Sequence, residues 1–249
     1  MKIRWEERGE GHPLLLAMGL GYARWGWGPI VAPLAEHYRV ISYDNRGIGE
    51  SDKPPGPYTA RIMADDALQV LDEAGVSSAY VFGVSLGGMV AQELVLAAPE
   101  RVDRLVLGCT HPGYDDGYPL PEVTAKLFAE APSLPPEVAL RRFVENSMVA
   151  RGAVAEEVYQ GRLANPYDPA GWAAQAAAGM TFAGVDQSRI DKPTLVLTGT
   201  EDNVVDARNS ELIAERIPSA RLERIEGTGH LFFWERPEEV VRLVRAFLG

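Results

Sequence analysis

Phe82-Gly83-Val84-Ser85-Leu86-Gly87-Gly88 is the stretch that decides the fold of this 249-residue chain. It follows an apolar run typical of a buried strand and precedes a helical segment at 89–98. A serine at a tight turn from strand to helix has strained backbone geometry, which small residues two positions before and after it relieve. The hydroxyl of Ser85 would then stand exposed above the sheet, as a nucleophile requires. The alternative is an ordinary turn in which Ser85 caps the helix.

Short apolar runs without alternation recur along the chain, and this pattern is typical of strands covered on both faces of a parallel sheet. They lie at 14–18, 40–43, 79–82, 105–107 and 195–197. Segments with helical periodicity separate them, among them 63–74 and 240–248. Pro237 is favourable at the start of the last helix, and Gly75 and Pro99 end earlier ones. The alternation of strand and helix predicts an α/β fold.

One region, 111–184, breaks this alternation. It is rich in proline and alanine, and it shows helical stripes but no clear apolar strand. We therefore predict a mostly helical cap inserted between two strands, whereas 1–110 and 185–249 together form the core domain.

A serine hydroxyl needs a base to accept its proton and a carboxylate to orient that base. His230 is the best candidate for the base, because it ends a glycine-rich loop, Glu226-Gly227-Thr228-Gly229-His230, between a strand-like segment and the last helix. Catalytic groups gather in loops at the carboxyl ends of parallel strands. The other three histidines precede the first strand (His12), end a polar helix (His37) and open the insertion (His111). For His230 the alternative is a loop histidine that caps the last helix.

Asp202 is the expected orienting acid. It lies in Thr200-Glu201-Asp202-Asn203, directly after an apolar strand. Glu201 and Asp206 are the nearest competitors. Asp206 has the position of an N-cap for the next helix, and Glu201 lies one residue short of the expected place.

Two backbone N–H groups are expected to hold the negative charge that develops on a carbonyl oxygen under attack. Leu86 offers one at the start of its helix, and Leu20 offers the other in the loop Met18-Gly19-Leu20-Gly21-Tyr22. Glycine on either side of Leu20 lets the main chain approach a substrate closely. The alternative for this loop is an ordinary glycine turn.

Together with Asp44-Asn45-Arg46-Gly47-Ile48-Gly49-Glu50-Ser51, these motifs resemble the α/β-hydrolase superfamily over nearly the whole chain. Within it, the chain is most similar to small bacterial carboxylesterases and enol-lactone hydrolases. The resemblance implies an α/β-hydrolase fold: a mostly parallel central sheet of seven or eight strands, flanking helices, and a helical cap inserted between strands 6 and 7. It implies the triad Ser85, Asp202 and His230, in the chain order nucleophile, acid, base, and neither a cofactor nor a metal.

Two departures from the family pattern stand out. Many relatives have His-Gly where this chain has Met18-Gly19, and because the oxyanion donor is a main-chain group, we expect the change to alter pocket polarity more than catalysis. The amino terminus also looks too short for the usual antiparallel first hairpin, which favours seven strands over eight.

The expected partner is a small-molecule ester or lactone. Hydrolysis of simple carboxylic esters through an acyl-enzyme is the leading hypothesis, followed by enol-lactone hydrolysis and then carbon–carbon bond hydrolysis. A lactone that carries a carboxylate would need a cation, and Arg24, the nearest one by sequence, is better interpreted as a solvated loop residue. A ligand receptor on the same fold is the alternative from another class of protein.

Several large apolar side chains could line an acyl or alcohol pocket, although side chains of this kind belong more often to a core. The candidates are Trp25, Trp27, Phe128, Phe143, Met148, Trp172, Met180 and Phe182.

The composition excludes several other classes of protein. A formal net charge of −11 argues against binding to nucleic acid or to anionic membranes, and the single cysteine, Cys109, allows no internal disulfide.

The sequence contains no apolar segment long enough to predict a signal or a membrane span, so we expect a cytoplasmic monomer or homodimer. No glycine-rich nucleotide motif opens a helix. Arginine outnumbers lysine 20 to 4 and Asn and Gln total 10, which favours a thermostable protein, although genome composition could produce the same bias.

Overall fold

The computed structural model describes all 249 residues. Its strands are β1 (Trp5–Arg8), β2 (His12–Ala17), β3 (Tyr38–Tyr43), β4 (Ala79–Val84), β5 (Val102–Gly108), β6 (Thr194–Gly199) and β7 (Ala220–Ile225). They form one seven-stranded sheet in the order β1-β3-β2-β4-β5-β6-β7, parallel except for β1, which pairs antiparallel with β3. The predicted α/β-hydrolase fold class is confirmed, in its seven-strand form.

Strand β1 has no apolar signal in the sequence. It is the edge of the sheet, with β3 as its only neighbour, and its segment reads Trp-Glu-Glu-Arg with three of four side chains exposed. An edge strand tolerates charged residues because only one side of it is covered. Glu7, for example, forms an ion pair with Arg39 of β3 at 2.5 Å.

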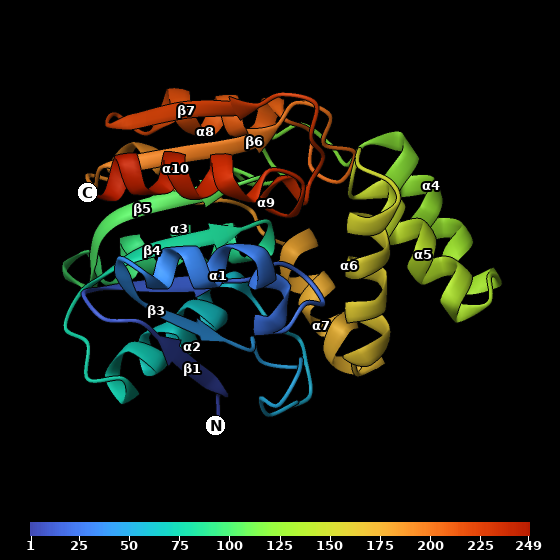
Figure 1. Cartoon of the computed structure of the whole chain (residues 1–249), viewed down its shortest axis with the longest axis horizontal. Helices are drawn as coiled ribbons and strands as arrows, with labels where there is room; N and C mark the ends of the chain where they lie inside the picture. The colour runs from blue at the N-terminus through green and yellow to red at the C-terminus, as the bar shows by residue number, and fades with distance from the viewer.

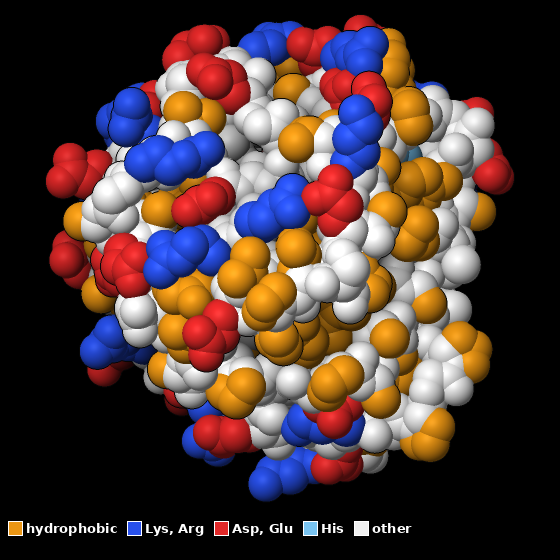
Figure 2. Space-filling model, turned by 90° about the vertical axis from the view of Figure 1, so that its right-hand side faces the viewer, with side chains coloured by type: hydrophobic (Ala, Val, Ile, Leu, Met, Phe, Trp, Pro, Cys, Tyr) orange, Lys and Arg blue, Asp and Glu red, His pale blue; other side chains and the backbone are white.

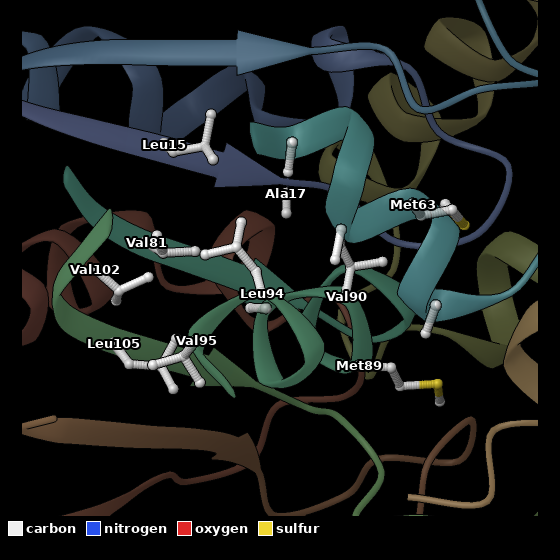
Figure 3. Close-up of a cluster of buried hydrophobic side chains, with 14 of the residues drawn as sticks. Leu15, Ala17, Met63, Val81, Met89, Val90, Leu94, Val95, Val102 and Leu105 are labelled. Atoms are coloured by element: carbon white, nitrogen blue, oxygen red, sulfur yellow. The ribbon is translucent and has the colours of Figure 1, made fainter. Parts of the chain in front are cut away.

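Helices cover both faces of the sheet (Figure 1). Successive side chains of β2 point to opposite sides, so that Leu14 and Leu16 join one core and Leu15 and Ala17 join the other. The first core packs against α1 (Gly28–Ala35), α9 (Phe232–Glu235) and α10 (Pro237–Leu248), and the second against α2 (Ala60–Glu73), α3 (Leu86–Ala97) and α8 (Arg208–Arg216). Figure 3 shows the second core, in which Leu94 and Val95 of α3 lie against strand residues. Short 3₁₀ turns occur at Arg24–Trp27, Pro99–Arg101, Ala131–Ser133 and Gln187–Arg189.

The predicted helix boundaries are confirmed where proline and glycine mark them. Thr59 accepts a hydrogen bond from the Ile62 N–H at the start of α2, and Gly75 follows the end of that helix with φ +68°. Pro99 lies just beyond α3, and Pro237 is the first residue of α10, where its missing N–H costs nothing.

The region between β5 and β6 is helical, as predicted. It contains α4 (Glu122–Glu130), α5 (Pro136–Asn146), α6 (Ala153–Ala164) and α7 (Pro169–Met180), which lie together at one end of the sheet (Figure 1). We call these four helices the helical insertion. The expected position, between strands 6 and 7, uses the strand numbers of a sheet with eight strands. With one strand fewer at the amino terminus, the insertion lies between the fifth and sixth strands.

None of the helices combines the length and the apolar character needed to cross a lipid bilayer.

Candidate active site

Ser85 occupies a strained turn between β4 and α3. Its φ of 54° and ψ of −122° are unusual for a residue other than glycine. Gly83 and Gly87 make the turn possible, because a Cβ at Gly83 would collide with the Gly87 carbonyl, and one at Gly87 would collide with backbone of the β2 end. The Ser85 N–H donates to the Gly108 carbonyl at 2.9 Å, and the Ser85 carbonyl accepts from the Thr110 hydroxyl at 2.6 Å. The backbone of Ser85 is therefore fixed on both sides.

His230 and Asp202 come together from two loops at the carboxyl ends of β7 and β6. The Nδ1 of His230 lies 2.7 Å from Oδ2 of Asp202. The other oxygen of Asp202 accepts hydrogen bonds from the N–H groups of Val204 and Val205, at 2.7 and 2.9 Å. The Asp202 side chain has no exposed surface, whereas the neighbouring Glu201 is exposed. The loop thus places Asp202, and not Glu201, against the histidine.

The electrostatics of His230 depend on this carboxylate. Burial of the imidazole lowers its pKa, but the interactions with Asp202 and Cys109 together more than offset this, so the pKa of His230 lies well above its ordinary value. Nε2 lies 4.0 Å from the Sγ of Cys109, whose own pKa is raised by burial. Cys109 is therefore a neutral thiol at neutral pH. Ser85 makes no hydrogen bond with His230 in this structure, although both line the same cavity.

The two expected oxyanion donors lie beside this turn. A Cβ added to Gly19 would be 3.1 Å from the Cβ of Ser85, so the loop after β2 passes directly over the serine. The N–H of Leu20 in that loop has no hydrogen-bond partner in the protein, and neither has the N–H of Leu86, the first residue of α3. Both amides are free to bind an anion.

The helical insertion holds the loop that carries Leu20. Gly21, the next residue, donates its N–H to the Gln175 side chain at 3.1 Å and accepts at its carbonyl from Nη1 of Arg162 at 2.6 Å. Gln175 lies on α7 and Arg162 on α6. Two helices of the insertion thus hold the peptide groups on both sides of Gly21.

A cavity of about 500 Å³ joins these groups. Ser85, His230 and Cys109 lie in its wall, and 17 of its 26 lining residues are hydrophobic, so it suits an apolar chain. Figure 2 views this end of the molecule, where hydrophobic side chains gather around a hollow. Of the candidate lining residues, Phe128, Phe143 and Trp172 line the cavity; Trp27, Met148 and Phe182 are buried in the cores, Trp25 packs against a core, and Met180 is exposed.

The other histidines lie away from Ser85, Asp202 and His230. His12 is exposed and pairs with Asp103, and His37 is exposed just before β3. His111 is buried. Its Nδ1 accepts a hydrogen bond from the Gly113 N–H, and its Nε2 bonds to the Tyr118 carbonyl. None of the three reaches the cavity at Ser85.

Two sequence interpretations of charged residues need adjustment. Arg24 is not a solvated loop arginine: it pairs with Asp44 at 2.6 Å and with Glu6 at 3.0 Å, so its charge is already neutralised. Asp206 does accept the N–H of Arg208 at the start of α8, as a capping residue would, but the helix begins one residue later than predicted.

Cys109, Asp202 and His230 could in principle hold a metal ion, because one ligand atom of each lies within 4.8 Å of the others. Both Asp202 oxygens already accept hydrogen bonds, and one of them engages Nδ1 of His230. Only Nε2 and the neutral thiol are left, fewer ligands than the three or four that a protein zinc site uses. The donor set does not fit a metal.

Sequence reasoning missed Arg162, which is buried in the cavity wall. A signal was present in α6, where Ala155, Val158 and Tyr159 form a buried stripe that Arg162 continues at helical spacing. A cation on an otherwise apolar stripe indicates a polar function for the buried face.

Comparison with known proteins agrees with the observed fold. The family model described as the alpha/beta hydrolase fold matches residues 12–237. The chain is 32% identical, over 99% of its length and 95% of the relative, to a protein of Azorhizobium caulinodans provisionally assigned as the carbamate hydrolase RutD. Among solved structures it resembles a thermophilic esterase of Thermogutta terrifontis (28% identity, TM-score 0.83, 99% and 92% of the two chains covered). It also resembles the enol-lactonase of Burkholderia xenovorans LB400 (26%, TM-score 0.85, 99% and 96% covered). The chain therefore belongs to the α/β-hydrolase family.

Proposed function

We propose that this protein is a serine hydrolase that cleaves carboxylic esters through an acyl-enzyme intermediate. One observation carries the proposal: His230 is bonded to the buried Asp202 at Nδ1, while the cavity that the histidine lines is also lined by Ser85. A base held in one tautomer beside an exposed serine hydroxyl is the arrangement that activates a nucleophile.

The first half-reaction forms the acyl-enzyme. Nε2 of His230 accepts the proton of Ser85 as its Oγ bonds to the ester carbonyl carbon. The N–H groups of Leu20 and Leu86 stabilise the oxyanion. The carbon–oxygen bond to the alcohol then breaks, and the departing alkoxide takes the proton back from His230. The missing hydrogen bond between serine and histidine does not oppose this step, because catalytic hydrogen bonds often tighten only when substrate binds.

The second half-reaction releases the acid. His230 accepts a proton from water, whose oxygen bonds to the acyl carbon, and the same two N–H groups hold the new oxyanion. The bond to Ser85 breaks, and the serine oxygen recovers its proton from His230. Asp202 stabilises the imidazolium in both halves and keeps Nδ1 protonated.

We also propose that 111–184 acts as a cap over the site. Its side chains Phe128, Phe143 and Trp172 form apolar walls of the cavity, and its helices hold the loop with Leu20. Such a cap excludes water and selects the acyl or alcohol part of the substrate.

Hydrolysis of lactones is the second candidate, because a cyclic ester offers the same carbonyl to Ser85 and the chain resembles an enol-lactonase. The chemistry differs only in that acid and alcohol leave as one molecule. A panel of 4-nitrophenyl esters and of lactones of graded size compares the two directly, by their kcat/KM values.

The test of the ester proposal compares wild type with Ser85→Ala on 4-nitrophenyl butyrate. We expect wild type to turn over many equivalents and the variant to lose about 10⁴-fold or more in kcat. Ser133→Ala, at an exposed serine between α4 and α5, serves as the control and should retain full activity. A single turnover that ends in a persistent adduct would instead indicate a ligand receptor, and an unchanged rate in Ser85→Ala would contradict the proposal.

A further inference from the structure

Arg162 is a buried cation without an acidic partner. Its side chain projects from α6 into the cavity wall, and the residue is 8% exposed. Its single hydrogen bond to the protein goes from Nη1 to the Gly21 carbonyl. No Asp or Glu is among the residues that line the cavity. The charge of Arg162 is therefore not neutralised by any carboxylate of the chain.

A charge in this position is costly unless something compensates it. The guanidinium carbon lies 4.4 Å from the ring centroid of Tyr22 and 5.3 Å from that of Tyr167. The π faces of these rings offset part of the cost. The guanidinium has five N–H donors in a planar fork, of which the Gly21 carbonyl uses one. The remaining donors can bind both oxygens of a carboxylate at once.

The surroundings indicate which anion fits. Arg162 is the only Lys or Arg that lines the cavity, and most of the lining is apolar. One positive charge matches one carboxylate, whereas a phosphate dianion calls for more cations. Arg162 is bonded to Gly21, next to Leu20. The carboxylate would therefore lie on the side of the cavity formed by the loop 18–22, which we call the oxyanion loop.

We propose that Arg162 binds a carboxylate of the substrate, so that the preferred ester carries a second, ionised carboxyl group. The inference rests on the proposed ester hydrolysis, and it names the substrate class. It also supplies, on α6, the cation that a substrate with a carboxylate needs and that Arg24, paired with Asp44, does not provide. The competing explanation is that Arg162 only positions the oxyanion loop.

The experiment uses pairs of esters that match in length. Mono-4-nitrophenyl succinate, glutarate and adipate are compared with 4-nitrophenyl butyrate, pentanoate and hexanoate, with spontaneous hydrolysis subtracted. For at least one length we expect wild type to prefer the anionic ester by about tenfold to a hundredfold in kcat/KM, as a charge-assisted hydrogen bond supplies. Arg162→Gln should abolish this preference, because kcat/KM falls further for the anionic ester than for its neutral match. Loss of the contact with Gly21 lowers the rate for both esters alike and does not change their ratio. Arg162→Lys should retain part of it.

A control variant separates local binding from the overall field of the protein. Arg142→Gln removes the same charge from the insertion, but at an exposed residue that pairs with Glu130 outside the cavity. It should leave the preference unchanged. An equal fall in kcat/KM for both members of a pair in Arg162→Gln would show that Arg162 only positions the loop and would overturn the inference. So would a wild type without preference at any length.

Binding without turnover separates this inference from the proposed function. Calorimetric titration of Ser85→Ala with monomethyl glutarate should show binding that the double variant with Arg162→Gln loses. If no ester is hydrolysed but this binding is present, the ester proposal fails and the carboxylate site stands. If esters are hydrolysed but monomethyl glutarate does not bind, the carboxylate site is wrong and the ester proposal stands.

Discussion

His230 donates from Nδ1 to a carboxylate oxygen of Asp202 across 2.7 Å, in a part of the molecule where the Asp202 side chain has no exposed surface. The second Asp202 oxygen is held by two backbone N–H groups, so the carboxylate cannot turn away. This relationship fixes the proton on Nδ1 and leaves Nε2 for the proton transfers of the proposed mechanism.

Replacing this carboxylate tests its role. Asp202→Asn keeps the shape but removes the charge and can present an amide N–H to Nδ1, which favours the wrong tautomer. We expect kcat on 4-nitrophenyl butyrate to fall by about 10³- to 10⁴-fold. Glu201→Gln, one residue away and exposed, is the matched control and should change kcat little. A larger loss in the Glu201 variant than in the Asp202 variant would mean that the orienting acid is misassigned.

The pH dependence of wild type follows from the same pair. The base must be neutral to accept a proton, so kcat/KM should rise as pH increases through the pKa of His230. Because the interactions with Asp202 and Cys109 together outweigh burial and raise that pKa well above the ordinary value, the acid limb should lie above about pH 6.5. Asp202→Asn removes the stabilising charge and should move the residual limb to lower pH. A wild-type limb below the ordinary histidine value, unmoved in the variant, would disagree with this account.

Cys109 provides a test of which side chain is the nucleophile. Its Sγ lies 4.0 Å from Nε2 of His230, but burial raises the pKa of the thiol and keeps it protonated. We therefore expect Cys109→Ala to retain kcat within about tenfold, far from the loss expected for Ser85→Ala. Steady-state rates of the two variants on one ester give the comparison. Loss of turnover in the cysteine variant alone would assign the nucleophile to the thiol.

The turn at Ser85 should tolerate no side chain at Gly87. A Cβ there would collide with backbone at the end of β2, and the helix preference of alanine, about 1 kcal/mol, is too small to compensate. We expect Gly87→Ala to lower the free energy of unfolding by about 1–3 kcal/mol or more. Gly179→Ala in α7 is the control, because its nearest atom would be Leu86 Cδ1 at 3.7 Å, an ordinary contact. Urea denaturation should show that variant equal to or more stable than wild type, and equal losses in both would refute the explanation.

Much of the fold is predictable from the sequence because the central strands are buried on both faces. Their apolar runs, and the turn at Ser85, mark the parallel sheet and its order of strands and helices. Strand β1 could not be found in this way, since an edge strand needs no apolar face and this one is Trp-Glu-Glu-Arg. Ser85, Asp202 and His230 could be chosen as site candidates from the sequence for a similar reason. Each follows a strand, and parallel strands end at one edge of the sheet.

The cavity wall was less predictable, because it depends on how the helical insertion docks. Phe128 lines the cavity and Phe182 belongs to a core, yet both are large apolar side chains of the same region. Arg162 meets Gly21 across 141 positions of sequence, and no local pattern specifies that contact. Only the packed structure shows which face of α6 meets the oxyanion loop.

Covalent trapping at Ser85 tests the central claim most directly. Wild type is treated with a fluorophosphonate, which reacts with an activated serine, and intact mass and peptide mapping are recorded together with loss of ester hydrolysis. The account predicts one adduct per chain, located at Ser85, that forms in proportion to the lost activity and is absent from Ser85→Ala. Complete loss of activity with the adduct at another residue, or sustained hydrolysis by a fully labelled Ser85, would contradict it.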